Sequence, residues 1–256
     1  MTKETKKLAV LIPCHNEAQS IASVVKKFPR AELEHNGYQL DIIVIDNNST
    51  DGTADVAQEA GARIFKERAK GKGNAMRKGF AELPADTDYV VMLDGDDTYS
   101  PTEILRMVEP LDSKFCNVVL GSRLSGKMRA GSMPMGNRAF NWFCAHIVRY
   151  VYRANITDVL TGYFAWTKKA IDELYPHLVS DGFAIEMEMI TKMSRLGHEI
   201  YCVPISYHPR HEEGASNIRP IYDGLRILKM FMRNLTWQPH PASDHFKQSL
   251  EHQEKA

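Results

Sequence analysis

The chain has 256 residues, 43% of them hydrophobic, which is enough to bury the core of one α/β domain with a C-terminal extension. Its 32 basic and 32 acidic side chains cancel, which argues against a general polyanion binder such as a nucleic-acid protein. The four cysteines have neither the spacing of a zinc site nor the density of a disulfide framework. With no secretory signal and no run of about 18 to 20 apolar residues, we expect a cytoplasmic protein.

Short apolar runs alternate with amphipathic segments through the first half of the chain. The predicted strands are 8–12, 41–46, 62–65, 89–93 and 117–120. The predicted helices are 18–28, 53–61, 73–83 and one that starts at Pro101. This alternation is typical of βαβ units, so we expect an α/β fold with a mostly parallel central sheet flanked by helices.

The second half is less regular. Residues 125–136 contain three glycines, one proline and three methionines, which predicts a mobile loop. Helical periodicity follows at 137–153, 185–196 and 218–237, with strands at 162–167 and 199–207. We expect one domain over residues 1–237 that ends in an amphipathic helix, then a flexible polar tail over 238–256.

Polar residues follow three of the predicted strands, at 13–17, 46–52 and 94–97. Ligands of an open α/β sheet bind beyond the carboxyl ends of its strands, so these segments should meet at one site. Asp94, Asp96 and Asp97 could aim hard oxygen ligands at Mg²⁺ or Mn²⁺, whose remaining ligands would be water and substrate phosphates. An acidic turn that caps the next helix is the alternative interpretation.

Residues 71–74, Gly-Lys-Gly-Asn, open a predicted helix and could hold a phosphate through backbone N–H groups and Lys72. The chain has no G-x-x-x-x-G-K-[ST] segment and no G-x-G-x-x-G after its first strand. Both absences argue against a P-loop ATPase and a Rossmann dehydrogenase.

Together these segments resemble the inverting GT-A glycosyltransferases of family 2, and within them the dolichol-phosphate mannosyltransferase-like polyprenyl-phosphate glycosyltransferases. The resemblance runs from about Leu8 to Leu235. It rests on Pro13-x-His15-Asn16-Glu17, Asp46-Asn47-x-Ser49-x-Asp51-Gly52-Thr53, Gly71-Lys72-Gly73, Asp94-x-Asp96, Gly121-Ser122-Arg123, and Arg210 with Gly214-x-Ser216. Each motif is weak alone, but their order and spacing are specific.

The resemblance implies a GT-A (nucleotide-diphospho-sugar transferase) fold and a role for each matching residue. The nucleotide-sugar donor would be bound by Pro13, His15, Glu17, Asp46, Asn48, Asp51, Lys72, Gly73 and Asp94. Asp94 and Asp96, with Asp97 or Thr98, would hold the metal. Arg123 and Arg210 would receive the acceptor phosphate and offset developing negative charge, with help from Arg138, Glu186, Ser216 and Arg219.

Several of these assignments have alternatives. Arg123, Arg138 and Arg210 could each be a structural arginine paired with a nearby acid, Arg138 more readily than Arg123, and Glu186 could simply stabilise the N-terminus of its helix. Many family members read Gly-x-Ser-Lys where this chain has Gly214-Ala215-Ser216-Asn217, so one phosphate-binding cation is either missing or supplied by Arg219.

The function implied is transfer of a sugar, mannose from GDP-mannose first and glucose or N-acetylglucosamine from a UDP donor next, to dolichyl or polyprenyl phosphate. Because a phosphate monoester is already ionised near neutral pH, the attacking oxygen needs positioning more than a base. A hydroxyl acceptor is the alternative and would need a base such as Asp97 or Glu186. A sugar nucleotidyltransferase and an inert nucleotide-sugar-binding module remain as other classes.

The lipid partner is inferred from helices 137–153 and 218–237, which mix aromatic and basic side chains as interfacial helices do. Both could instead simply cover the core. With no membrane span, we expect peripheral contact with the cytoplasmic face of a membrane, directly or through a partner. From the sequence alone, we expect Asp96→Ala to abolish sugar transfer, and Arg123→Ala to depress it severely while leaving the fold intact.

Overall fold

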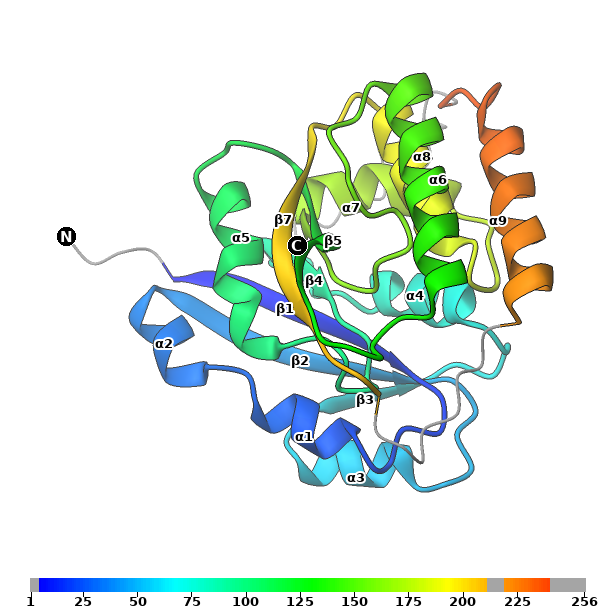
Figure 1. Ribbon diagram of the computed structural model, residues 1–256. Helices are drawn as coiled ribbons and strands as arrows, with labels where there is room; N and C mark the ends of the chain where they lie inside the picture. The colour runs from blue at the N-terminus through cyan, green and yellow to red at the C-terminus, as the bar shows by residue number, and fades with distance from the viewer. Residues whose placement is uncertain (1–4, 211–218, 240–256) are drawn as a thin grey trace.

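Seven strands form one central sheet in the computed structural model, which describes residues 5–210 and 219–239 (Figure 1). The order across the sheet is β3-β2-β1-β4-β6-β5-β7. The strands are β1 (Lys6–Cys14), β2 (Tyr38–Asp46), β3 (Arg63–Lys66), β4 (Tyr89–Met92), β5 (Val118–Met128), β6 (Phe164–Thr167) and β7 (Ile200–Tyr207). The apolar runs of β1, β2, β4 and β6 and of the first half of β5 are buried on both faces, as expected for strands covered by helices on both sides.

Four of the six strand pairings are parallel, which confirms the predicted mostly parallel α/β sheet. β1 pairs with β2 and β4, β2 with β3, and β5 with β7 in parallel register. β6 lies antiparallel between β4 and β5. The start of β6 therefore lies at the same edge as the end of β4.

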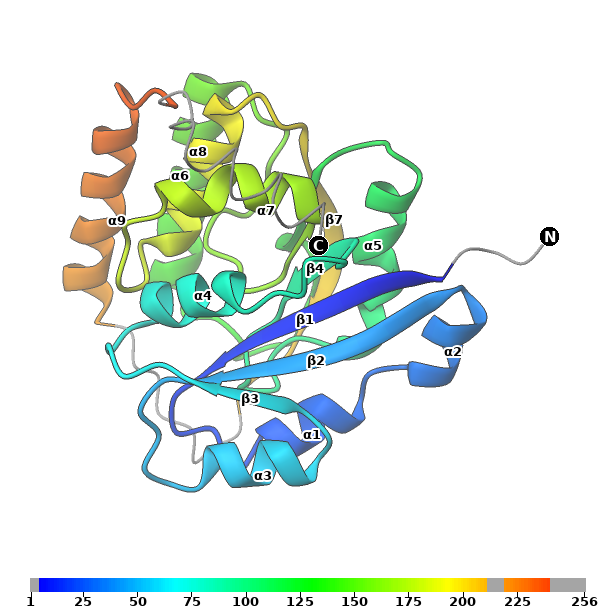
Figure 2. The ribbon, with the colours of Figure 1, turned by 180° about the vertical axis from the view of Figure 1, so that it is seen from behind.

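Helices cover both faces of the sheet (Figures 1 and 2). One face is covered by α1 (Ile21–Lys26), α2 (Arg30–His35), α3 (Thr53–Glu59), and α5 (Ile104–Asp112), which follows the 3₁₀ turn η1 (Pro101–Glu103). The other is covered by α4 (Lys72–Ala81), α6 (Met135–Tyr152), α7 (Lys168–Leu174), η2 (Tyr175–His177), α8 (Ile185–Arg195) and α9 (Pro220–Asn234). Each face has its own cluster of buried apolar side chains.

The predicted mobile loop over 125–136 is wrong in its first part, because β5 continues to Met128. Lys127 pairs with Ser206 and Met128 with Tyr207 of β7, after a shift of register. Gly126 lies at this shift, where a Cβ would be only 1.9 Å from the Ile205 carbonyl oxygen. A glycine that indicates a loop in the sequence is here a strand residue at a point of close backbone approach.

α6 and α9 lie side by side at one end of the molecule (Figures 1 and 2). Phe140 lies 3.5 Å from the position of a Cβ on Gly224, and the rings of Tyr152 and Phe231 are 6.1 Å apart. Both helices also expose large apolar side chains: Met135, Trp142, Phe143, Tyr150 and Val151 on α6, and Ile221, Tyr222, Leu225 and Met232 on α9. No helix within residues 5–210 and 219–239 has the length and apolar character needed to cross a bilayer.

Candidate active site

A cavity of about 520 Å³ opens beyond the carboxyl ends of β1 and β4. Its walls come from the segments after these strands, the start of α4, the middle of β5, the segment before β6, and α6, α8 and α9. The polar lining includes His15, Glu17, Lys72, Asp94, Asp96, Arg123, Glu186 and Arg210. Residues far apart in the sequence thus meet where the open sheet was expected to bind its ligand.

Asp94 and Asp96 form the acidic part of the cavity. Asp96 is buried; its Oδ1 accepts from the amide and hydroxyl of Thr98, and its Oδ2 pairs with Arg210. Asp94 lies against Gly162, where a Cβ would be 1.9 Å from Oδ2. Burial raises the pKa of Asp94, and the neighbouring Lys72 opposes that rise.

Lys72 joins this acidic part to α8. Its Nζ is 2.7 Å from Asp94 Oδ1 and 2.7 Å from Glu186 Oε1, and its side chain is 11% exposed. Burial alone would lower the pKa of Lys72, but the two carboxylates raise it above its usual value. The ammonium is therefore a fixed positive charge inside the cavity.

His15 and Asn47 line the part of the cavity between β1 and α4. His15 Nδ1 is 2.7 Å from the Asn47 carbonyl oxygen, and since a carbonyl only accepts, Nδ1 carries the hydrogen. The Asn47 side chain donates to the Ala69 carbonyl oxygen at 2.7 Å and accepts from the Gly71 amide at 2.6 Å. Asn47 thus fixes both the imidazole and the turn that carries Lys72.

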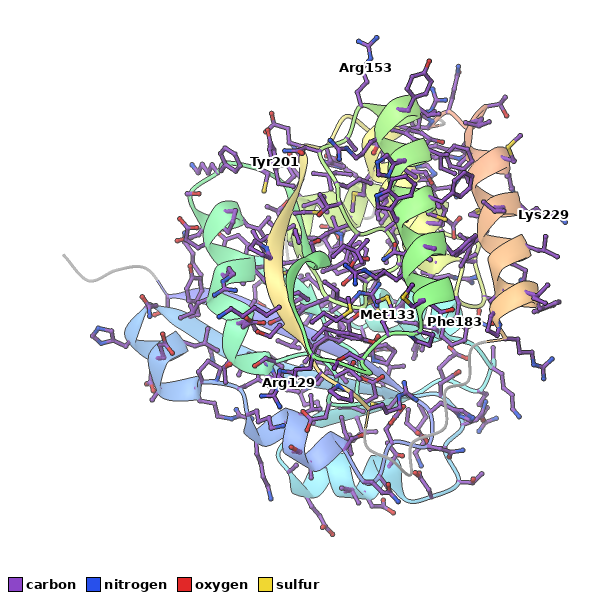
Figure 3. The ribbon with its side chains drawn as sticks, in the orientation of Figure 1. Arg129, Met133, Arg153, Phe183, Tyr201 and Lys229 are labelled. Carbon is purple, nitrogen blue, oxygen red and sulfur yellow. The ribbon has the colours of Figure 1, made fainter. Side chains whose placement is uncertain are left out.

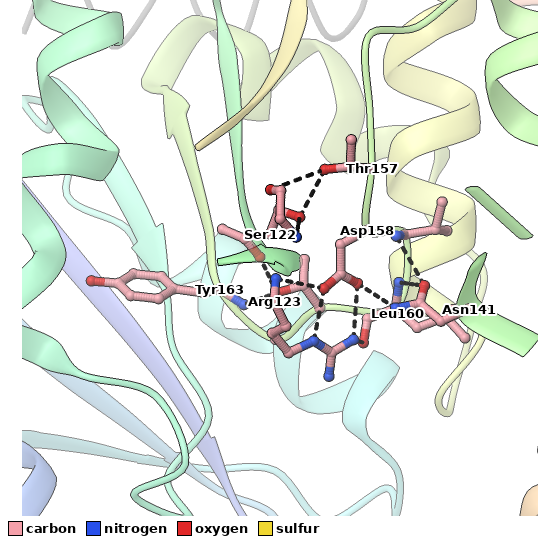
Figure 4. A network of polar contacts seen from close by, with 12 residues as sticks. Ser122, Arg123, Asn141, Thr157, Asp158, Leu160 and Tyr163 are labelled. Carbon is pink, nitrogen blue, oxygen red and sulfur yellow. Dashed lines mark hydrogen bonds and ion pairs between the residues drawn. The ribbon is translucent and has the colours of Figure 1, made fainter. Parts of the chain in front are cut away.

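Arg123 forms the basic part, on the β5 side. Its Nε is 2.8 Å from Asp158 Oδ2 and its Nη2 is 2.9 Å from Asp158 Oδ1 (Figure 4). Asn141 of α6 donates to the same carboxylate at 2.6 Å, and its own oxygen accepts from two backbone amides at 159 and 160. The guanidinium also lies over the Tyr207 ring, 5.1 Å from its centroid. The plane of the guanidinium is therefore fixed before any ligand arrives.

Apolar side chains line the remaining part of the cavity, between the start of α6 and the start of α9. They are Met133, Pro134, Phe140, Leu160, Phe183 and Ile227. Figure 3 shows Met133 and Phe183 near these helix ends, while Arg153 and Lys229 point outward from the molecule. One cavity thus combines carboxylates, fixed cations and an apolar wall.

Comparison with known proteins identifies the family. The model of Glycosyl transferase family 2 matches residues 9–175, which is more than half of the chain. The chain belongs to glycosyltransferase family 2. The region matched contains the acidic pair, Lys72 and Arg123 of the cavity, so the resemblance inferred from the motifs is confirmed.

Two curated relatives and one solved structure extend this result. Glycosyltransferase AglJ of Haloferax volcanii is 34% identical over 91% of this chain and 73% of its own length. A dolichyl-phosphate hexose transferase of the same organism is 29% identical over 88% of this chain and 92% of its own length. Crystalline glucosyl-3-phosphoglycerate synthase from Mycobacterium tuberculosis, with Mn²⁺, UDP and phosphoglyceric acid, gives a TM-score of 0.70 at 20% identity, covering 92% of this chain and 80% of its own. The structural likeness shows the GT-A fold.

Most residues assigned by the family 2 motifs lie at the cavity. Pro13, His15, Glu17, Lys72, Asp94, Asp96, Arg123, Glu186 and Arg210 line it. Gly73 lies directly behind the lining, buried against the backbone of residue 180.

Four assigned residues at the donor side lie elsewhere among the described residues. The Asp97 carboxylate pairs with Lys27 at 2.5 Å and is not among the residues lining the cavity, whereas Thr98 is. Asp51 accepts from the amides of Ala18 and Thr53 and holds the start of α3. Asp46 accepts from the Ser49 amide, and Asn48 donates to the Arg68 carbonyl oxygen. These side chains shape the loops around the cavity.

The residues assigned to the acceptor phosphate also lie partly at the cavity and partly elsewhere. Arg138 is exposed on α6, and Arg219 is exposed just before α9, where its amide donates to Asp223. Neither is among the residues lining the cavity. Ser216 lies outside the described residues.

The motifs missed Asp158 and Asn141, which hold Arg123. Asp158 stands in the apolar run Ile156-Thr157-Asp158-Val159-Leu160 and is fully buried. A buried acid in such a run needs a buried cation as its partner. Asp158 in this run was therefore the available signal for a buried ion pair. The sequence could not reveal that the cation is Arg123, 35 residues earlier.

Proposed function

We propose that this family 2 enzyme transfers a hexose from a nucleotide sugar to the phosphate of a polyprenyl phosphate. The observation that carries the proposal is Arg123, a guanidinium fixed by Asp158 in the same cavity as Asp94 and Asp96. A cavity with fixed cations beside a carboxylate pair suits a reaction between two phosphorylated substrates. The curated dolichyl-phosphate hexose transferase supports the same substrate class.

Asp94 and Asp96 fit a divalent cation whose other ligands come from the donor and water. Within residues 5–210 and 219–239, no group of three His, Cys, Asp or Glu side chains could hold a metal unaided. Mg²⁺ and Mn²⁺ characteristically use one or two carboxylates together with substrate phosphates, so a site of two aspartates suits them. The bound cation would neutralise charge on the departing nucleoside diphosphate.

The chain's own groups then bind and orient the substrates. His15, Glu17 and Pro13 would surround the nucleoside, and Lys72 would contact the donor diphosphate. Arg123 would hold the acceptor phosphate, since an arginine fork meets phosphate oxygens in pairs. Arg210, which pairs with Asp96 in this structure, would supply a second cation for the substrate phosphates. Attack opposite the leaving group inverts the anomeric centre.

The apolar wall and the outer faces of α6 and α9 suit a lipid acceptor. The exposed side chains include Trp142, Phe143 and Tyr150 on α6 and Ile221 and Leu225 on α9. Aromatic and basic amphipathic helices of this kind bind at the interface of a bilayer. We propose that this end of the molecule rests on the cytoplasmic face of a membrane, so that the headgroup of the lipid reaches Arg123.

A transfer assay tests the proposal. Purified protein is incubated with Mg²⁺ or Mn²⁺, a short polyprenyl phosphate, and GDP-mannose, UDP-glucose or UDP-N-acetylglucosamine in separate reactions. Mass spectrometry should detect a glycosyl polyprenyl phosphate with one donor, GDP-mannose being our first expectation. Absence of this product with every donor, alongside transfer to an alcohol acceptor, would contradict the proposal.

A further inference from the structure

The segment that joins η2 to α8, residues 178–184, forms one wall of the cavity and packs on the turn carrying Lys72. Its backbone lies directly on the two glycines that flank this lysine. A Cβ on Gly71 would lie 2.1 Å from the carbonyl oxygen of Asp181, and one on Gly73 would lie 2.3 Å from the preceding carbonyl oxygen. The position of Lys72 therefore depends on where this segment lies.

Glu188 holds the segment from the other side. Its carboxylate accepts from the Val179 amide at 3.0 Å and from the Ser180 amide at 2.7 Å. Lys192, one turn along α8, donates to it at 2.6 Å, and the two side chains are 0% and 3% exposed. A buried carboxylate satisfied by two amides and an ammonium holds its partners in a fixed arrangement.

The first turn of α8 therefore restrains Lys72 in two ways. Glu186 contacts its ammonium directly at 2.7 Å. Glu188, two residues later, faces away from that ammonium, because successive helix residues turn by about 100°. Its effect passes through residues 178–184 to the glycines on either side of Lys72.

We propose that Glu188 is a positioning residue that fixes segment 178–184 on the turn 71–73 and so sets the place of the Lys72 ammonium beside Asp94. The identity of the ligand at this place, the diphosphate of a nucleotide, rests on the proposed function. Without the Glu188 carboxylate the two amides and Lys192 lose their common acceptor. The segment then shifts, and Lys72 meets the diphosphate less well.

Calorimetric titration of the full chain with Mn²⁺ and either UDP or GDP tests this inference. Glu188→Gln preserves size but removes the charge and one acceptor oxygen. Lys72→Met removes the charge-assisted contact to the nucleoside diphosphate and should weaken its binding roughly tenfold. Glu188→Gln should weaken binding to a similar extent, because it displaces the same ammonium. The double variant should bind no more weakly than Lys72→Met, because both substitutions act through one ammonium. The melting temperature should fall under either role, because a buried ion pair is broken. A merely structural role would instead give losses of affinity that add in the double variant.

The matched control is Glu82→Gln, which breaks the partly exposed i,i+4 pair with Lys78 on α4 itself. It should leave the affinity unchanged. If Glu188→Gln does not fold, Glu188→Gln/Lys192→Met, which removes both buried charges, is measured instead. Wild-type affinity in these variants, or additive losses with Lys72→Met, would overturn the positioning role. If the wild-type protein binds neither diphosphate, the proposed function fails as well.

Discussion

Arg123 and Asp158 make a two-point contact, with Nε 2.8 Å from Oδ2 and Nη2 2.9 Å from Oδ1 (Figure 4). The arginine side chain is 8% exposed and the aspartate 0%. Breaking such a buried pair from one side leaves an uncompensated charge and costs about 3–5 kcal/mol. Arg123→Ala is therefore expected to destabilise the fold, contrary to the expectation from the sequence, and is a poor probe of catalysis.

Arg123→Lys tests the role of the guanidinium with the charge retained. Lysine cannot reproduce the planar fork, so glycolipid formation should fall by roughly tenfold to a hundredfold. Arg138→Lys on the exposed face of α6 is the matched control and should retain activity. Initial rates at saturating donor measure the effect, and equal rates in the two variants would argue against Arg123 as the acceptor-phosphate contact.

Asp96→Asn tests the divalent cation. The side chain keeps its size, and its oxygen can still accept from Thr98, so we expect a folded protein. Glycolipid formation should be abolished, and chelation of divalent metal should have the same effect on the wild-type enzyme. Transfer that survives both treatments would exclude the cation assigned to this carboxylate.

Gly162→Ala tests the placement of Asp94. A Cβ at this position would lie 1.9 Å from Asp94 Oδ2, so the carboxylate must move. A misplacement of about 1 Å can cost roughly a hundredfold in rate, and we expect a loss of that order. Gly136→Ala in α6, where a Cβ meets nothing within 4 Å, is the control and should match the wild-type rate. Comparable rates in the two variants would contradict the proposed role of Asp94.

Glu17 should make stability depend on pH. Burial raises its pKa from 4.5 to about 7, and Arg210 opposes that rise. Between these values the folded chain binds a proton that the unfolded chain releases, so stability falls as pH rises through this window. Glu17→Gln cannot titrate at this position and lacks this fall. The free energy of unfolding of the variant should therefore exceed that of the wild type by about 1–3 kcal/mol at pH 8, but not near pH 4.5. Urea unfolding at both pH values measures the difference.

The apolar face of α6 and α9 should bind lipid. Sedimentation with vesicles containing anionic lipid should bring down the wild-type protein, and Tyr150→Glu with Leu225→Glu should reduce this binding strongly. Both side chains are well exposed, so the changes should spare the fold. Phe115→Glu, an exposed apolar residue after α5, is the control. If only the control variant loses vesicle binding, the membrane contact lies elsewhere.

The sequence predicts the donor side better than the acceptor side. Strand ends are visible as polar residues after apolar runs, and they correctly bring His15, Asp94 and Asp96 to one cavity. The contact between Arg123 and Asp158 depends on β6 and the segment before it, whose arrangement no local pattern contains. The sequence could not choose between Asp97 and Thr98 for a related reason: the backbone of Asp97 has φ +62°, and its side chain meets Lys27 outside the cavity lining.

The reversed direction of β6 has a consequence for how substrate preference can change. Since β6 begins where β4 ends, the crossing from α6 brings Asp158 to Arg123, Leu160 to the cavity lining and Gly162 to Asp94 before the chain enters the sheet. Lengthening or exchanging that crossing before Gly162 would remodel the Arg123 side of the cavity, which the proposed function assigns to the acceptor. The parallel register of β1 with β4 would stay in place. Provided that Gly162 and its contact with Asp94 are kept, the side of the cavity proposed for the acceptor can therefore be redesigned separately from the side proposed for the donor.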